Sequence, residues 1–160
     1  ASGRGAAILQ APAALVVKHP HLPHQRGSTS FPLPGTFSQF FTLTPLEDLP
    51  TSGVLLGLSN QPAATGQGFR SNLGYFNPND SAVTLHLAAY SSDNQLLAAK
   101  SVVLPPKAND IKGVSELFGA ALNTQTEFFV RFTVSGGSAV VFGSVVDNIT
   151  GDAVTIWPQS

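Results

Sequence analysis

From Thr36 onward, apolar and polar residues alternate over much of the chain with a period of two, as half-buried β-strands do. Segment 81–91, SAVTLHLAAYS, is the clearest case. Its apolar face is expected to point into a core and consists of Val83, Leu85, Leu87 and Ala89. The residues between them, including His86 and Tyr90, are expected to face outward. The segment therefore predicts a strand with one buried face.

Several further segments are strand-like and are separated by turn-forming residues. They cover residues 36–44, 53–59, 68–77, 94–104, 126–135, 138–148 and 152–158. Residues 77–80, 91–94 and 148–151 have turn composition, and residues 135–137 (Ser-Gly-Gly) predict a hairpin between the strands on either side. Short strands at this spacing predict an all-β, Ig-like antiparallel β-sandwich, with a closed barrel as the alternative.

One short helix is expected over residues 110–118. Asn109 and Asp110 are residue types that cap helices, and Gly119 is a typical helix terminator. The apolar residues at helical spacing between them are Ile111, Val114, Leu117 and Phe118.

The chain divides into an extended N-terminal arm with a Pro-rich linker at residues 1–35 and a β-sandwich domain at residues 36–160. Four prolines within residues 18–35 exclude a helix and favour an extended linker. Such a linker reaches roughly 50 Å at about 3.1 Å per residue, which is enough to carry the arm to a neighbouring molecule.

The arm contains an apolar segment, AAILQAPAALVV, at residues 6–17. An extended conformation places only apolar residues on one of its faces, which should not remain in water. The residues expected to contact a partner are Ile8, Leu9, Ala11, Ala13, Leu15 and Val17. A signal-peptide hydrophobic region and an arm that folds back as an extra edge strand of its own sandwich are the alternatives.

Composition and charge exclude several classes of partner and chemistry. Charged residues make up 11% of the chain, against about 25% in ordinary soluble domains. The net charge of −1 argues against nucleic acid as a partner, and no apolar run approaches the roughly 20 residues of a membrane span. The chain has no cysteine, which excludes disulfides and thiolate chemistry. Residues 1–46 carry three bases and no acid, whereas residues 47–160 carry five bases and nine acids.

Two stretches of the domain carry a family resemblance. FRSNLGYFNPNDSAVTLHLAAYSSDNQLLAAKSVVLPP, followed later by SVVDNITGD, resembles a β-sandwich module that recurs in secreted proteins of bacteria. The opening FR-[ST]-N-LG…NP and the closing VDN-x-TGD are the matching motifs, and the resemblance covers about residues 53–158. It implies an extracellular, non-catalytic module of uncharacterised function. Methionine is absent even at position 1, so we expect a processed or trimmed product, and a removed signal peptide is one explanation.

Candidate chemistry is sparse. His19, His21 and His24 form H-P-H-L-P-H and have the ligand type that copper, zinc or nickel prefers, although a solvated linker is the alternative. The first 46 residues hold no carboxylate to orient these rings. No G-x-S-x-G motif is present, and His86 is the only histidine in the domain, so we expect no hydrolase. We expect no cofactor.

Other polar groups have simpler explanations. Asp147, Asn148 and Asp152 offer oxygen ligands for Ca²⁺, but their spacing is not that of an EF-hand, and a hairpin held by Asx hydrogen bonds is the simpler explanation. The tripeptides Asn79-Asp-Ser and Asn148-Ile-Thr match the N-glycosylation pattern. Trp157 is either a sugar-stacking platform or an edge anchor.

These observations favour a non-enzymatic extracellular structural subunit. It would self-assemble into a homo-oligomer or homopolymer, filamentous or pilus-like, when the N-terminal arm adds as a strand to a neighbouring subunit. The alternative is a cell-surface or carbohydrate-binding accessory module with a surface glycan as its partner. That alternative requires an exposed aromatic row or a loop-end pocket, for example near Tyr75, Tyr90 or Trp157.

Overall fold

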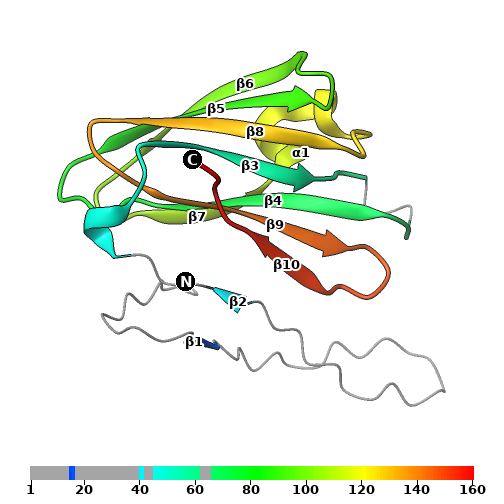
Figure 1. Ribbon diagram of the computed structural model, residues 1–160, viewed down its shortest axis with the longest axis horizontal. Coiled ribbons are helices and arrows are strands. Elements are labelled where there is room, and N and C mark those ends of the chain that lie inside the picture. Colours follow the sequence, from blue (N-terminus) through cyan, green and yellow to red (C-terminus); the bar gives the residue numbers. More distant parts are fainter. Residues whose placement is uncertain (1–14, 17–39, 42–44, 62–65) are drawn as a thin grey trace.

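The computed structural model describes residues 15–16, 40–41, 45–61 and 66–160 (Figure 1). Within this part, the chain forms two antiparallel four-stranded sheets that pack against each other. The predicted all-β, Ig-like sandwich with one short helix is confirmed, and the closed barrel is not formed. None of the helices in these residues is long and apolar enough to cross a bilayer.

The first sheet has the strand order β3-β8-β5-β6 and the second has the order β10-β9-β4-β7. The strands of the first sheet are β3 (Ser52–Leu58), β8 (Phe128–Ser135), β5 (Val83–Ser91) and β6 (Leu96–Leu104). Those of the second are β10 (Ala153–Ile156), β9 (Val140–Asp147), β4 (Phe69–Phe76) and β7 (Asn109–Gly113). The helical elements are η1 (Leu46–Asp48), α1 (Val114–Phe118) and η3 (Gly119–Leu122).

The strand β5 shows the predicted alternation. Its apolar residues Val83, Leu85, Leu87 and Ala89 are buried, whereas His86 is exposed. These side chains meet the inward residues of the other sheet and the largest core rings, Phe128 and Phe132. Burial of each large side chain contributes about 1.5–3 kcal/mol, so the core of the sandwich rests on this alternation.

The hairpin predicted at residues 135–137 is wrong. The strand before it, β8, belongs to the first sheet, and the strand after it, β9, belongs to the second. Gly136 and Gly137 have φ angles of 88° and 158°, and they turn the chain from one sheet to the other. The Asn79 side chain supports this corner because its Nδ2 donates to the Ser138 carbonyl at 2.7 Å. Glycines permit the sharp turn, but the apolar faces decide which strands pair.

The helix is shorter than predicted. Residues Asn109–Gly113 form β7, in which Asp110 pairs with Tyr75, and α1 begins only at Val114. Asp110 does not cap the helix, since its Oδ1 accepts a hydrogen bond from the Ile111 amide. Ile111 does not supply the helical core contact expected of it, because it is 40% exposed on the edge strand. Gly119 ends the helix with a φ of 76°, as predicted.

The side of the sandwich near β6 and β7 is filled by the helical segment. Val114 and Leu117 of α1 and Leu122 of η3 are buried in the core. The helical segment therefore closes the core at the side of the sandwich near β6 and β7 (Figure 1).

Two short strands lie outside the sandwich. β1 (Leu15–Val16) pairs antiparallel with β2 (Phe40–Phe41), with Leu15 opposite Phe41. β2 lies beside β10, but neither β1 nor β2 extends a four-stranded sheet in the described structure (Figure 1). Of the predicted partner-binding residues, only Leu15 lies in β1. Ile8, Leu9, Ala11, Ala13 and Val17 lie outside the described residues, as do His19, His21 and His24.

Candidate binding surfaces

The free edges of the two sheets are the first candidate surface, because an edge strand presents unpaired backbone groups to a further strand. The sandwich has four such edges: β3 and β6 in the first sheet, and β10 and β7 in the second. They differ in length and in what covers them.

The strand β6 is the longest edge, with nine residues. Its sequence, LLAAKSVVL, is largely apolar, yet Leu96 is 59% exposed and Val103 is 66% exposed. Within the described residues, the backbone of residues 96–103 forms no hydrogen bond beyond its ladder with β5. β6 is therefore a long, apolar and open edge.

The other three edges are shorter or partly covered. At β3, the amide and the carbonyl of Val54 both bond to Gln159, at 2.9 and 2.8 Å, and the ladder is irregular between Leu55 and Leu58. β10 has four residues and is followed by Pro158 after Trp157. β7 has five residues, of which Asp110 and Lys112 are charged. Short strands, bulges and charges are ways in which proteins protect edges.

The outer face of the first sheet carries an aromatic and cationic cluster. The Tyr90 and Phe129 rings are stacked with centroids 5.3 Å apart. The Cζ atom of Arg131 lies 5.0 Å from the Tyr90 centroid and 5.4 Å from the Phe129 centroid. Cation–π contacts of this kind hold the guanidinium in place. A hollow of about 540 Å³ adjoins the cluster and is lined by His86, Tyr90 and Arg131, among others.

His86 lies between two serines on the same face. Its Nδ1 is 2.9 Å from the Ser101 Oγ, and its Nε2 is 3.1 Å from the Ser135 Oγ. Both ring nitrogens thus contact hydroxyl oxygens, and neither contacts a carboxylate that would orient the ring for catalysis. The geometry is that of an exposed cross-strand polar row.

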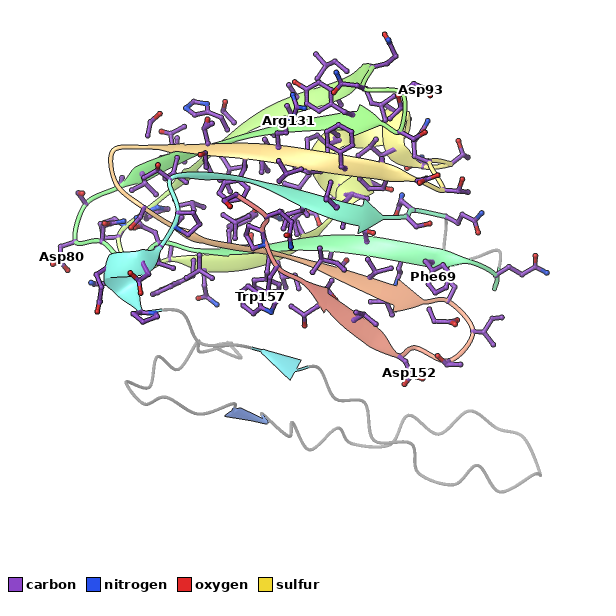
Figure 2. The ribbon with its side chains drawn as sticks, in the orientation of Figure 1. Phe69, Asp80, Asp93, Arg131, Asp152 and Trp157 are labelled. Atoms are coloured by element: carbon purple, nitrogen blue, oxygen red, sulfur yellow. The ribbon has the colours of Figure 1, made fainter. Side chains whose placement is uncertain are left out.

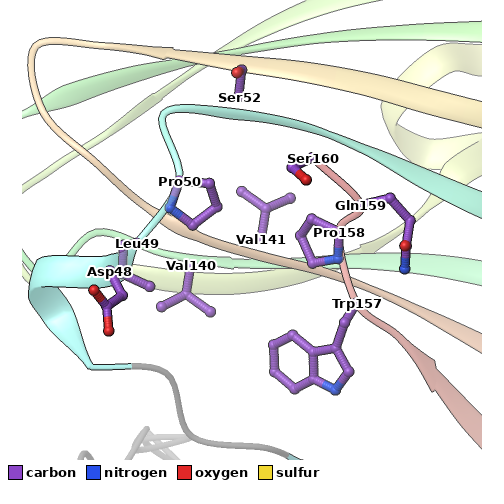
Figure 3. A pocket seen from close by; sticks show the side chains of 10 residues that line it. All are labelled: Asp48, Leu49, Pro50, Ser52, Val140, Val141, Trp157, Pro158, Gln159 and Ser160. Atoms are coloured by element: carbon purple, nitrogen blue, oxygen red, sulfur yellow. The ribbon is translucent and has the colours of Figure 1, made fainter.

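A second hollow, of about 500 Å³, lies beside the C-terminal segment, where the residues before and at the start of β3 meet the start of β9 (Figure 3). It is lined by apolar residues that include Leu49, Pro50, Val140 and Trp157. The Trp157 ring packs on Phe142, with centroids 6.0 Å apart and planes tilted by 45°. Trp157 therefore anchors the end of β10 against β9, while Figure 2 places it and Arg131 on opposite sides of the sandwich.

The two motifs that carry the family resemblance lie on the paired strands β4 and β9, and a side-chain contact also joins them. Arg70 of the opening motif donates from Nη1 to the Oδ1 of Asn148 in the closing motif, at 2.8 Å. Asn148 Nδ2 in turn donates to the carbonyls of Gln61 and Gln67, at 3.2 and 2.9 Å. These contacts attach the β9–β10 turn to the loop before β4, so both motif residues act within the fold.

Two side-chain oxygens of the calcium candidate at this turn are engaged in hydrogen bonds. The Asp147 Oδ1 accepts hydrogen bonds from the amides of Ile149 and Thr150, at 2.7 and 3.2 Å. Asn148 Oδ1 accepts from Arg70. The hairpin is thus held by Asx hydrogen bonds, which was the simpler expectation. Within the described residues, no group of three or more His, Cys, Asp or Glu side chains is arranged to hold a metal ion.

Asn77 of the opening motif lies at the crossing between the sheets and is fully buried. Its Nδ2 contacts the carbonyls of Ser81, Leu104 and Pro105 at 2.8–3.0 Å. Its Oδ1 accepts from the amide and the Nδ2 of Asn79, at 2.9 and 2.7 Å. The first sequon asparagine, Asn79, is therefore half-buried in this network.

Sequence analysis missed Asn60, which is 5% exposed. Its Nδ2 donates to the Leu122 carbonyl at 2.8 Å and to the Ser115 Oγ at 2.9 Å, and so connects the end of β3 to the helical segment. A polar residue in the turn composition Ser-Asn-Gln-Pro gives no sign that it will be buried. Asn60 is buried because α1 and η3 pack against it, which the local sequence does not reveal.

Tyr75, which the sequence offered as a surface aromatic, is 2% exposed and does not form part of a binding face. Burial raises the pKa of its hydroxyl, and the negative charge of Asp110 raises it further. On the neighbouring strand, a hydrogen bond to Glu116 raises the pKa of Lys112. Both pKa shifts result from burial, neighbouring charges and a hydrogen bond at the β7 edge, and they do not indicate a reactive centre.

The fold and its surfaces define an antiparallel β-sandwich with one open edge and one aromatic–cationic face. No family model matches the chain, and no curated protein matches it significantly. Among solved structures, a chain described as "Anabaena sensory rhodopsin transducer" is 16% identical, with a TM-score of 0.47. That match covers 57% of this chain and 90% of the other, and at this level it carries no argument about function.

Proposed function

We propose that the protein is a non-enzymatic, extracellular structural subunit that assembles when its N-terminal arm adds as a strand to a neighbouring subunit. The observation that carries this proposal is that both four-stranded sheets and the core are complete without the arm. The described arm residues, Leu15–Val16, adopt strand conformation but extend neither sheet.

The energetics of the arm support assembly. Leu9, Leu15 and Val17 would contribute about 1.5–3 kcal/mol each on burial, or about 4.5–9 kcal/mol together before entropy costs. The charge distribution supports it as well, because the arm and linker are basic and acid-free while the domain carries the acids. A head-to-tail contact repeated in this way gives rings or open filaments.

Deletion of residues 1–17 tests the proposal. We expect a folded monomer, measured by light scattering at two concentrations and by circular dichroism, whereas the full chain assembles as concentration rises. A control variant with His19, His21 and His24 changed to serine keeps the apolar segment and should assemble as the full chain does. If the deleted chain still forms polymers, strand addition by the arm is wrong.

A second function, binding of a surface glycan, is favoured by the Tyr90–Phe129–Arg131 cluster beside its hollow. Aromatic rings and a fixed guanidinium suit a sugar that carries a carboxylate. Retention of the full chain on such glycans should fall at least about tenfold in Tyr90→Ala and Arg131→Ala. Thr126→Ala, a change at an exposed position just before β8 that does not line the hollow, should leave retention unchanged. Equal retention of all three variants would contradict this function.

A further inference from the structure

We infer that the free edge of β6 is the acceptor strand, and that its occupant is the segment at residues 6–17 of a second copy of this chain. The inference rests on the proposed function and adds the surface at which assembly takes place. β6 is the longest of the four edges, and in the described residues the backbone of residues 96–103 bonds only to β5, although α1 and η3 lie beside the strand. Its nine residues can pair along their whole length with the twelve-residue apolar segment of the arm.

Pairing at β6 would give hydrogen-bond partners to outward backbone groups of this strand and would cover its exposed apolar side chains. An edge strand directs about half of its backbone N–H and C=O groups away from its partner strand. A strand added at β6 would bond to these groups and would cover Leu96 and Val103, which are among the most exposed apolar residues of the domain. No other edge combines unpaired backbone with exposed apolar side chains over such a length.

Lys100 restricts which strand β6 can accept. It lies opposite Leu87 in the ladder, on the core-facing side of β6, yet it is exposed. Residue 100 is also the midpoint of Leu96–Leu104, so two copies of β6 in full antiparallel overlap would place the two lysines opposite each other. Like charges in that position repel, and an inward-pointing lysine is a known protection of sheet edges. Residues 6–17 carry no charge and escape this penalty.

Charge also suggests the direction of the added strand. Lys18 directly follows the apolar segment, and Asp93 lies in the turn before β6, where it forms no ion pair with another described residue. An antiparallel arm would bring its Lys18 end toward this turn, whereas a parallel arm would bring Lys18 toward Lys107, whose charge is already paired with Asp80 at 2.9 Å. The antiparallel direction is therefore favoured.

The pairing described within one chain is one that the arm would have to give up. Within the described residues, β1 and β2 pair over two residues each, Leu15–Phe41 and Val16–Phe40. An isolated two-stranded ladder of this size is marginal in water, whereas a strand added to β6 joins a four-stranded sheet. Release of Leu15–Val16 from β2 therefore gives up few hydrogen bonds.

The absence of cysteine makes cross-linking a clean test. Copies that carry Ala13→Cys are mixed with copies that carry Ala99→Cys on β6, and a short bis-maleimide is added. We expect heterodimers, identified by mass spectrometry, in the full-length mixture. Copies with Val154→Cys on β10 serve as the control, since Val154 is 63% exposed on an edge of the other sheet. Cross-links to Val154→Cys in place of Ala99→Cys would overturn the β6 assignment while strand addition stands.

A second pair of variants does not depend on cross-linking. Val103→Lys and Val154→Lys make the same change at residues that are 66% and 63% exposed, on β6 and β10 respectively. Val103→Lys should raise the concentration at which half of the chains assemble by about tenfold, and Val154→Lys should leave it unchanged. If both variants assemble like the wild type, the β6 assignment is wrong. If the wild type forms no assembly in either experiment, the proposed function itself fails.

Discussion

The two sheets of the sandwich differ in how their polar side chains are used. In the second sheet and the loops attached to it, Arg70, Asn77 and Asn148 bond to other parts of the same chain. In the first sheet, Arg131 and His86 lie on an exposed outer face, and β6 leaves its edge open. The motif residues Arg70, Asn77 and Asn148 therefore stabilise the fold, while the surfaces available to partners consist of common residue types.

This difference has a physical origin. A buried amide is costly unless its partners are fixed, so residues such as Asn77 demand a defined sequence context. An open edge uses backbone groups that every residue has, and it needs only length and a lack of charge. We expect substitutions around the second sheet to change stability and substitutions on the first sheet to change association.

The largest effect is expected for Asn77→Ala. The change removes the side-chain donor to the buried carbonyl of Leu104 and to the carbonyl of Pro105, and it also removes the acceptor for Asn79. Unfolding in urea should show a loss of about 3–4 kcal/mol. Asn123→Ala, at a half-buried position after η3 where the side chain has no hydrogen-bond partner among the described residues, should cost less than about 0.5 kcal/mol. Equal losses of stability in the two variants would mean that a buried, fully bonded asparagine such as Asn77 contributes no more than a half-buried one such as Asn123.

Asn148→Ala should lower stability by about 2 kcal/mol, because it breaks the contact with Arg70 and two hydrogen bonds to the loop before β4. A double-mutant cycle with Arg70→Ala should give a coupling of about 1 kcal/mol. The matched change in the first sheet is Arg131→Ala, at an exposed position, with an expected loss below about 1 kcal/mol. A coupling near zero would mean that the two motifs are not held together by this pair.

Gly74→Ala tests the packing on the outer face of the second sheet. A Cβ at this position would lie 2.1 Å from the Phe142 ring, so the ring must move. We expect a loss of about 1–2 kcal/mol by thermal or urea unfolding, partly recovered when Phe142→Leu is added. Gly113→Ala, on the adjacent strand, meets nothing closer than 3.7 Å and should change stability by less than about 0.5 kcal/mol. Similar losses in the two variants would exclude the ring contact as the cause.

The sequence was sufficient for the sandwich, for the alternation of β5 and for the turn at residues 91–94, because each depends on local periodicity or turn chemistry. It was not sufficient at residues 135–137, where the same glycines serve a hairpin or a crossing between sheets. Asn60 and the Arg70–Asn148 contact were also missed, since each joins residues that are more than 50 positions apart. The open edge of β6 follows from strand order, which local pattern does not fix.

The smallest effect is expected for Tyr75→Phe. At neutral pH the hydroxyl is protonated in both states, and its loss should change the free energy of unfolding by less than about 0.5 kcal/mol. Burial and the nearby Asp110 raise the pKa of Tyr75 in the folded state above its ordinary value. The contribution of this raised pKa to the free energy of unfolding is therefore fully present below about pH 10. It is lost as the pH rises through the folded-state pKa.

Urea unfolding of the wild type and of Tyr75→Phe at a series of pH values from 7 to above 10 measures this difference. The wild type should lose stability more steeply than the variant above about pH 10, because its unfolded state releases the tyrosine proton first. The β4–β7 ladder makes this a local test, since Tyr75 lies directly opposite Asp110. Identical slopes for the two proteins would show that Tyr75 ionises as readily in the fold as in the unfolded chain. In that case the edge at β7 would be more open to water than its burial indicates, and β6 would lose its distinction as the one open edge among the described strands.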